Sequence, residues 1–479
     1  MILELHEKLK LKKISSTEIT QTYLKNISQT KTNAFLTVCK DQALATAKFA
    51  DEKFVKGENV SYLTGIPLGL KDNLCTEGTR TTCASKILEN YTPPYDATVV
   101  KRLKDLGAVV LGKLNMDEFA MGGSNENSAF GPVKNPLNLE YVSGGSSGGS
   151  AASVKAGLAV AALGSDTGGS IRLPASYTGT VGLKPTYGLV SRYGLVAFAS
   201  SLDQIGPLCL SVEDAAIMLS AISGHDPHDS TSAPNPPKDY LNLMKNHSNQ
   251  KFKIGIPKEY FVGGIQKEVL QKTNELKSTL AKAGHTLVDI SLPYTEYSVA
   301  VYYVVAISEA SSNLARFDGV RFGARLASNG TLFEMYKKTR SLFGEEVKRR
   351  ILLGTFALSS GYYDAYYKKA CQVRRLIKQD FDEAFRKVDV VLAPVSPTTA
   401  YKIGEKISDP LQMYLNDIFT IPVNLAGLPG ISIPVGRDAK NLPIGVQFIG
   451  KPFAEEEILS LAYWSEQNFY KEPEVKDGI

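Results

Sequence analysis

The chain has 479 residues, with 54 Lys and Arg against 49 Asp and Glu, and 43% of its residues are hydrophobic. The length allows about three domains or one large α/β unit, and the net charge of +5 is too small to indicate a nucleic-acid coat or a polybasic membrane anchor. The five cysteines are too widely spaced to predict a disulfide scaffold or a CxxC motif: Cys39, Cys75, Cys83, Cys209 and Cys371.

The N-terminus mixes acidic with basic residues and has no uninterrupted apolar stretch, so we expect no secretory signal or transit peptide there. The longest notable apolar run, residues 299–307, falls far short of the roughly 20 residues that a membrane-spanning helix needs. These two features predict a cytoplasmic protein.

The first 60 residues have the pattern of helices. Ser15 followed by Glu18 has the spacing of a capping box, which marks a helix start, and the alanine-rich stretch 41–56 predicts another helix. We therefore expect residues 1–60 to form an N-terminal helical segment packed on the core, and residues 61–479 to form one catalytic domain.

After Gly65 short apolar runs alternate with helical patterns. Residues 66–70 and 108–112 predict strands, and residues 96–106 predict a helix between them. This alternation is typical of βαβ units and of a mixed or mostly parallel sheet. Residues 141–182 contain only three charged residues, which predicts the buried centre of a first half spanning about 65–215.

The proline-rich stretch 224–237 predicts a surface loop that leads to a second half, about 250–479. The fold class is therefore α/β: a single large unit whose central mixed β-sheet is covered by helices on both faces. In the second half we expect a final helix after the last strand, helices over 266–283 and 362–385, and strands over 251–257, 286–293, 388–394, 430–436 and 443–450.

Two Gly/Ser clusters, residues 143–150 and 164–170, lie inside the charge-poor centre. A flexible linker would lie between domains, so glycine here is better explained by close backbone approach, with N–H groups turned toward a ligand or a developing anion. A phosphate-binding P-loop is excluded, because Gly112-Lys113 and Gly450-Lys451 are not followed by Ser or Thr.

Ser147 lies at the centre of a G-x-S-x-G pattern, the nucleophile elbow of hydrolases that use a Ser-His-Asp triad. That interpretation needs a downstream histidine, and all four candidates have the surroundings of surface residues. His225 and His228 lie near Asp226 and Asp229 in the sequence, but further metal ligands at a diagnostic spacing are missing, so we expect a solvated loop and no metal site there. The candidates are His225, His228, His247 and His285.

Lys71 directly follows an apolar strand-like run. A lysine buried at a strand end can lose its proton, because desolvation can lower its pKa by several units from about 10.4. A serine with a neutral lysine is a workable nucleophile and base, although an exposed lysine at a strand end is the more common case.

Three separated motifs identify a family. Lys71 in GLKDN, Ser146 in GGSSGGS and Ser170 in GSDTGGSIR match, in order and spacing, the Ser-cis-Ser-Lys signature of the amidase signature family. Over about residues 10–470 the chain further resembles the glutaminase subunits of the tRNA-dependent amidotransferases. That resemblance rests on TTCASKILENY, GKLNMDEFAMGGSNENSAFG, LVAFASSLDQIGP, EVKRRILLGTFALSSGYYDAYYKKA and NLAGLPGISIPVG.

The resemblance implies the roles of the catalytic residues. Ser170 is expected to be the nucleophile, and Ser146, next to a cis peptide bond, is expected to relay its proton to Lys71. Backbone N–H groups around Thr167, Gly168 and Gly169 are expected to form the oxyanion hole, which typically supplies a few kcal/mol of transition-state stabilisation.

The resemblance also implies how glutamine is bound. Arg350 is expected to pair with its α-carboxylate and Asp417 with its α-amino group. Seen alone, each would more often be a surface charge; Asp417 lies among apolar residues, which favours a paired role, whereas Arg350 lies beside Arg349 and its own residues leave both interpretations open. Ser124 is expected to hydrogen-bond and orient Lys71, and the pair Tyr302 and Tyr303 to line the same pocket.

The function implied is that of a glutaminase component of a tRNA-dependent amidotransferase, with a stand-alone amidase of the same family as the alternative. The expected partners are the amidotransferase subunits B and C in a heterotrimer. The first of these partners is expected to bind the misacylated tRNA and to use ATP and Mg²⁺ to activate Glu-tRNA(Gln) or Asp-tRNA(Asn). This chain is expected to bind no cofactor of its own.

Overall fold

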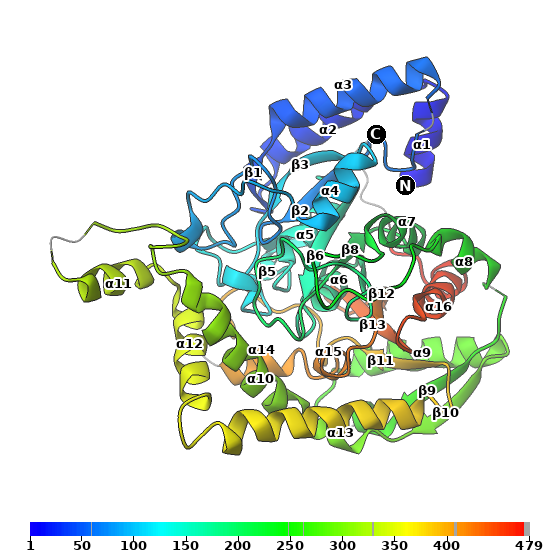
Figure 1. Cartoon of the computed structure of the whole chain (residues 1–479). Coiled ribbons are helices and arrows are strands. Elements are labelled where there is room, and N and C mark those ends of the chain that lie inside the picture. The colour runs from blue at the N-terminus through cyan, green and yellow to red at the C-terminus, as the bar shows by residue number, and fades with distance from the viewer. Residues whose placement is uncertain (59, 248, 262, 328–329, 407–409, 474–479) are drawn as a thin grey trace.

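A computed structural model describes the chain from residue 1 to 473, apart from residues 59, 248, 262, 328–329 and 407–409 and the side chains of 410–412. Its centre is an 11-stranded sheet in the order β1-β3-β2-β6-β8-β7-β12-β13-β11-β9-β10 (Figure 1). The strands are β1 Phe35–Val38, β2 Pro67–Lys71, β3 Val109–Leu114, β6 Ala161–Asp166, β7 Val181–Lys184, β8 Gln204–Cys209, β9 Lys253–Pro257, β10 Thr286–Ile290, β11 Val390–Pro394, β12 Gly430–Arg437 and β13 Pro443–Gly450; β4 Lys134–Asn135 and β5 Asn138–Val142 form a separate pair.

The sheet is mixed, which confirms the predicted fold class. β2 runs parallel to both β3 and β6, and β9 runs parallel to β10 and β11, whereas β8, β12 and β13 make antiparallel pairs. Every residue of β2 and β6 is buried, as expected for strands covered on both faces. The strands β6 and β8 were not predicted, because β6 consists mostly of small residues and β8 has a glycine and a proline in its middle, so neither gives a β-branched or alternating signal.

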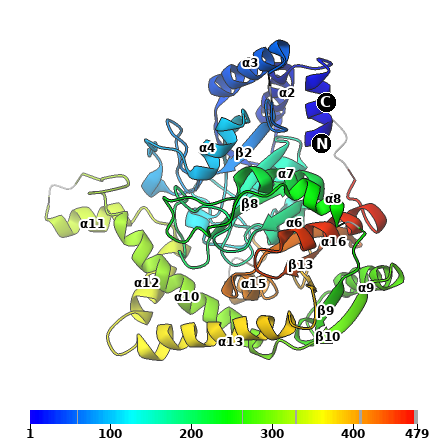
Figure 2. The ribbon, with the colours of Figure 1, turned by 45° about the vertical axis from the view of Figure 1, so that its right-hand side comes forward.

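Helices cover both faces of the sheet (Figures 1 and 2). On β13 a Cβ at Gly445 would touch Ser176 of α6, and one at Gly450 would touch Ile458 of α16. Successive residues of a strand face opposite sides, so α6 and α16 lie on opposite faces. The helices in this part of the fold are α4 Thr98–Asp105, α5 Gly148–Lys155, α6 Arg172–Thr178, α7 Val212–Ile222, α8 Tyr240–Asn246, α9 Lys267–Lys282 and α16 Glu455–Asn468.

The N-terminal segment consists of α1 Ile2–Lys10, α2 Ser16–Gln29, β1 and α3 Lys40–Lys56. The predicted capping box is present: the Glu18 carboxylate accepts from Ser15 N–H at 2.8 Å, and Ser15 Oγ accepts from Glu18 N–H at 3.1 Å. The segment is not purely helical, because β1 pairs antiparallel with β3 at the edge of the main sheet. The domain boundary at residue 60 remains a prediction.

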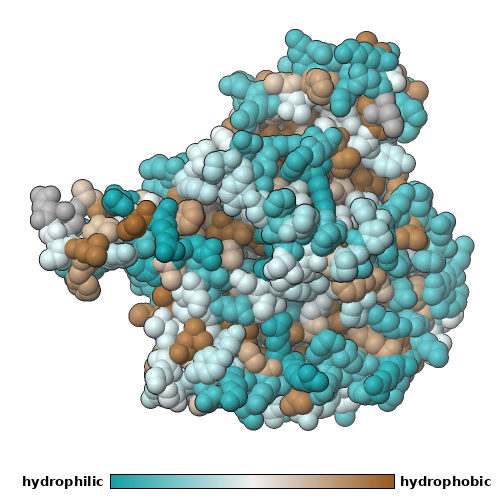
Figure 3. All heavy atoms as spheres, viewed as in Figure 1, coloured by the Kyte–Doolittle hydropathy of each residue, from teal (hydrophilic) through white to brown (hydrophobic). Residues whose placement is uncertain are grey.

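The second half carries a helical arm and two long helices (Figure 1). The helix predicted from residue 362 begins later, at Lys369, because Asp364–Lys368 adopts a π-helical turn after Gly361, whose φ is +86°. Hydrophobic side chains stand out on the arm around α11 (Figure 3), where Leu332 and Phe333 are exposed. The helices are α10 Ser298–Asn313, α11 Leu332–Arg340, α12 Glu345–Ala357, α13 Lys369–Ala384, α14 Pro410–Leu415 and α15 Ile421–Leu425.

Within the described ranges, no helix has both the length and the apolar composition to cross a bilayer. Stretch 224–237 contains no helix or strand, as predicted, but it is anchored to the core, since Asp226 accepts from Ser191 Oγ and Thr98 Oγ1, each at 2.5 Å. His228 lies beside the same carboxylate. One expectation is wrong: His285 is a buried residue, stacked on Phe252, whose N–H donates to its Nδ1 at 3.2 Å.

Candidate active site

The predicted catalytic residues meet at one edge of the sheet. Lys71 is the last residue of β2, and Ser170 lies in the turn that follows β6. Because β2 and β6 are parallel neighbours, their carboxyl ends lie side by side. Ser146 lies in the turn before α5, and the N–H of the next residue, Ser147, donates to Ser170 O at 3.1 Å. This contact holds the two Gly/Ser turns together.

Lys71 is fully buried and surrounded by serine oxygens. Its Nζ lies 2.8 Å from Ser146 Oγ, 2.8 Å from Ser147 Oγ and 2.9 Å from Ser165 Oγ. Burial lowers the pKa of Lys71 from its ordinary value of 10.5 to about 7, against the opposing effect of nearby carboxylates, first among them Asp117. Near neutral pH much of this lysine is therefore an uncharged amine that can accept a proton.

Ser146 and Ser147, in the turn before α5, differ in the hydrogen bonds that their hydroxyl groups make. Ser147 Oγ donates to Ser165 O at 3.0 Å and accepts from Lys71, so its hydroxyl is already engaged at the start of α5. The Gly145–Ser146 peptide bond is cis, and among the described residues the Ser146 hydroxyl has a hydrogen bond to Lys71 alone. The structure places no histidine in contact with Ser147, so within the described chain the nucleophile-elbow interpretation has no support.

Ser170 is the most open of the three predicted residues. Ser170 is 7% exposed, whereas Lys71 and Ser146 are completely buried. In the described part of the chain its Oγ makes no hydrogen bond, including none to Ser146. A hydroxyl that is accessible and makes no hydrogen bond, next to a buried serine and a buried amine, has the arrangement expected of a nucleophile.

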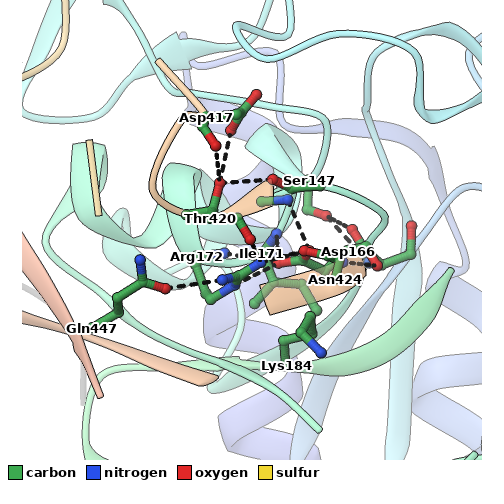
Figure 4. A network of polar contacts seen from close by, with 12 residues as sticks. Ser147, Asp166, Ile171, Arg172, Lys184, Asp417, Thr420, Asn424 and Gln447 are labelled. Atoms are coloured by element: carbon green, nitrogen blue, oxygen red, sulfur yellow. Dashed lines mark hydrogen bonds and ion pairs between the residues drawn. The ribbon is translucent and has the colours of Figure 1, made fainter. Parts of the chain in front are cut away.

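The Ser170 turn is held by a buried ion pair (Figure 4). The Asp166 carboxylate accepts from the N–H groups of Gly169 at 2.8 Å and Ile171 at 3.1 Å, and from Arg172 Nε at 3.1 Å. Asn424 Nδ2 donates to the same carboxylate at 2.9 Å. Burial alone would raise the pKa of Asp166, but Arg172, together with Lys184 and Asn424, outweighs burial and brings the pKa down to about 2.

The predicted oxyanion donors are only partly available. Gly169 N–H is engaged by Asp166, which corrects its assignment as a free donor. The N–H groups of Thr167, Gly168 and Ser170 donate to no other described residue. Thr167 is fixed through Oγ1, which donates to Asp203 Oδ1 at 2.7 Å. The oxyanion donors are therefore better assigned to Thr167, Gly168 and Ser170.

Other side chains pack closely against Gly168 and Gly169 of this turn. A Cβ at Gly168 would come within 2.7 Å of the Tyr302 ring, and one at Gly169 within 2.5 Å of Asp417 Oδ1. Two of the residues predicted to bind substrate therefore lie directly against the nucleophile turn. Asp417 is half-buried, and burial together with Asp166 raises its pKa well above the usual range.

Arg350, and not its neighbour, faces the interior. Its side chain is 4% exposed whereas that of Arg349 is 47% exposed. Arg350 lies against the rings of Tyr303, Phe198 and Tyr414, at 5.3, 5.5 and 5.6 Å from their centroids. Only its Nε has a hydrogen-bond partner among the described residues, Glu346, so both terminal nitrogens are free to bind a carboxylate.

One predicted contact is wrong. Ser124 does not orient Lys71, because the hydrogen bonds of Lys71 Nζ go to Ser146, Ser147 and Ser165. Ser124 Oγ instead accepts from Glu126 N–H at 3.3 Å, and its backbone packs against Gly145. Ser124 therefore supports the Gly145–Ser146 turn from behind.

Several residues of the site were missed from the sequence: Ser165, Asp117, Asp203, Glu346 and Tyr414. Asp117 accepts from Asn125 N–H at 2.9 Å and lies against Gly145, where a Cβ would be 2.0 Å from Oδ2. Burial raises the pKa of Asp117 to about 6. Its position in the motif NMDEF, just after a buried strand, was the available signal. Within the described residues no group of three or more His, Cys, Asp or Glu side chains is placed to hold a metal ion.

Comparisons with known proteins agree with this geometry. The amidase family matches residues 18–459. The chain is 58% identical over 468 residues to the A subunit of the glutamyl-tRNA(Gln) amidotransferase of Carboxydothermus hydrogenoformans, covering 97% of this chain and 96% of that protein. The crystal structure of the protein of the same name from Thermotoga maritima has 46% identity and a TM-score of 0.79 over 96% of this chain and 95% of that one. The peptide amidase of Stenotrophomonas maltophilia has 29% identity and a TM-score of 0.82 over 100% and 98%.

Proposed function

The chain belongs to the amidase family, and from that membership we propose that it is the glutamine-hydrolysing component of a tRNA-dependent amidotransferase. The observation that carries the proposal is that the interior of the site presents both Arg350 and Asp417, with Asp417 lying directly against the Ser170 turn. A cation with two free donors and a carboxylate match the two charged ends of an α-amino acid. The relatives that are named as glutamyl-tRNA(Gln) amidotransferase components support the same substrate.

The proposed reaction begins with proton transfer. Lys71, as a neutral amine, takes the proton of Ser146 while Ser146 takes that of Ser170, and Ser170 Oγ attacks the side-chain amide carbon of glutamine. Lys71 then returns the proton through Ser146 to the amide nitrogen. The C–N bond breaks, ammonia leaves, and a glutamyl ester remains on Ser170. Water attacks that ester by the same route in reverse and releases glutamate.

Charge on the carbonyl oxygen is stabilised in the tetrahedral intermediate by the free backbone N–H groups of Thr167, Gly168 and Ser170. Losing one such donor typically costs about 3 kcal/mol in the barrier. Asp203 accepts a hydrogen bond from Thr167 Oγ1, and Asp166 accepts one from Gly169 N–H. These two bonds hold the turn in position before negative charge develops on the carbonyl oxygen.

We further propose that the ammonia passes to two partner proteins, the B and C subunits of a heterotrimer. The B subunit would bind the misacylated tRNA and use ATP and Mg²⁺ to activate Glu-tRNA(Gln), and by the same chemistry Asp-tRNA(Asn). On this proposal the chain acts in the cytoplasm, where misacylated tRNA is formed. It needs no cofactor of its own, because the proposed acyl transfer uses only serine, lysine and backbone groups.

The test uses the assembled complex with Ser170→Ala. Glutamine-dependent transamidation should be lost, whereas transamidation with added ammonium chloride should remain at the wild-type rate, because ammonia bypasses this site. Loss of both activities would contradict the assignment. A stand-alone peptide-type amidase is favoured instead if the isolated chain hydrolyses simple carboxamides as fast as glutamine and partners, ATP and misacylated tRNA do not change the rate.

A further inference from the structure

Glu346 connects the two parts of the site that meet the charged ends of the substrate. It lies in the first turn of α12 and is buried, at 6% exposure. Its Oε1 accepts from Arg350 Nε at 2.8 Å and from Tyr414 Oη at 2.9 Å, and its Oε2 accepts from Arg349. One carboxylate therefore binds α12 to the end of α14.

Tyr414 and Asp417 belong to one turn of that second segment. Asp417 N–H donates to Tyr414 O at 3.3 Å, and Thr420 N–H donates to Asp417 O at 3.0 Å. The Tyr414 ring also packs on Tyr303 of α10, with centroids 3.9 Å apart. The position of the Asp417 carboxylate is therefore linked, through Tyr414 and Glu346, to the position of the Arg350 guanidinium.

The engagement of Nε also determines how Arg350 can bind a ligand. A guanidinium offers a carboxylate either its Nε side or its end with both η nitrogens. Glu346 occupies Nε, which leaves the end with both η nitrogens free among the described residues. The aromatic rings beside the guanidinium restrict its rotation, so its two free η nitrogens point in one direction.

We propose that Glu346, acting through Tyr414, is a positioning residue that fixes the separation of Arg350 and Asp417, and so selects substrates with both an α-carboxylate and an α-ammonium group. This inference rests on the proposed function, since it takes Arg350 and Asp417 as the two contacts to glutamine. It adds a specificity determinant that touches no substrate atom. A fixed separation of Arg350 and Asp417 does not strengthen the binding of simple amides or of substrates with one charged end.

The experiment measures kcat and KM of the assembled complex for glutamine and for 4-carbamoylbutanoate, which keeps the carboxylate and lacks the amine. Tyr414→Phe removes one hydroxyl and keeps the ring that packs on Tyr303. We expect it to raise KM for glutamine about fivefold, as the net loss of one ordinary hydrogen bond would, with kcat within twofold of wild type. KM for 4-carbamoylbutanoate should change less, so the ratio of kcat/KM for glutamine to kcat/KM for 4-carbamoylbutanoate should fall.

Glu346→Gln removes the negative charge that strengthens both hydrogen bonds to Oε1 and should lower the preference for glutamine in the same way. Tyr363→Phe, a matched change at an exposed tyrosine, should leave KM for both substrates unchanged. Equal effects of Tyr414→Phe on the two substrates, or no effect on either, would overturn the inference, because a merely structural contact predicts that result.

Two further variants separate this inference from the proposed function. Asp417→Asn and Arg350→Gln should each raise KM for glutamine strongly. If they do and Tyr414→Phe does not, the positioning role fails and the proposed function stands. If neither changes KM for glutamine, the substrate assignment itself fails, and the positioning role fails with it.

Discussion

The buried amine of Lys71 predicts how glutamine hydrolysis depends on pH. Only the uncharged amine can accept the proton of Ser146, and burial brings the pKa of Lys71 to about 7. The uncharged fraction is then about 10% at pH 6 and about 90% at pH 8, so kcat/KM should rise nearly tenfold over this interval. The sign is fixed by the role: a base is active in its deprotonated form, so activity increases with pH.

The assay is the initial rate of glutamate formation by the assembled complex at low glutamine concentration and constant ionic strength, with circular dichroism at each pH to confirm that the protein stays folded. Lys71→Arg should be inactive throughout, because a guanidinium does not deprotonate. Asp117→Asn should move the midpoint to lower pH, because the Asp117 charge raises the pKa of Lys71. A flat profile between pH 6 and 8, or full activity of Lys71→Arg, would refute the neutral-lysine base.

Three further predictions concern the two turns that carry Ser170 and Ser146. Gly169→Ala should lower kcat at least a hundredfold, because Gly169 has φ +147° and its new Cβ would lie 2.3 Å from Thr420 Oγ1; steady-state kinetics on folded protein checks this. Asp166→Ala should lower the free energy of unfolding by about 3–5 kcal/mol, measured by urea denaturation, because it leaves Arg172 buried without its partner. Ser124→Ala should change kcat less than about threefold, since Ser124 does not contact Lys71, and a hundredfold loss would restore the predicted contact.

Local patterns were sufficient to predict much of the second half of the fold. The strands β9, β11, β12 and β13 lie where apolar, β-branched runs predicted them, and the helix α9 likewise. Patterns failed where residues are small or where the backbone departs from regular geometry. The strand β6 is rich in small residues, β8 is interrupted by a glycine and a proline, and the π-helical turn before α13 has no recognised sequence signature.

The candidate site shows the same division. The proposal that Lys71 is a base followed from a lysine at the end of an apolar strand, and the structure indeed buries it completely. Arg350 was expected from the resemblance alone, because neighbouring residues on a helix differ by about 100° in direction and only the position of α12 decides that Arg350, and not Arg349, faces inward. The role of Glu346 depends on a contact with Tyr414, 68 residues away, which no local pattern encodes.

The surroundings of Lys71 have a consequence for how the enzyme acquires activity. Ser146 and Ser165, which surround its amine, are 75 and 94 residues away along the chain. Contacts of such long range form late in folding, since the closure of long loops has to precede them. A partly folded chain would expose Lys71 to water and leave it protonated. Recovery of glutamine hydrolysis after dilution from denaturant should therefore follow the slowest folding phase, so that a chain still being synthesised releases no ammonia.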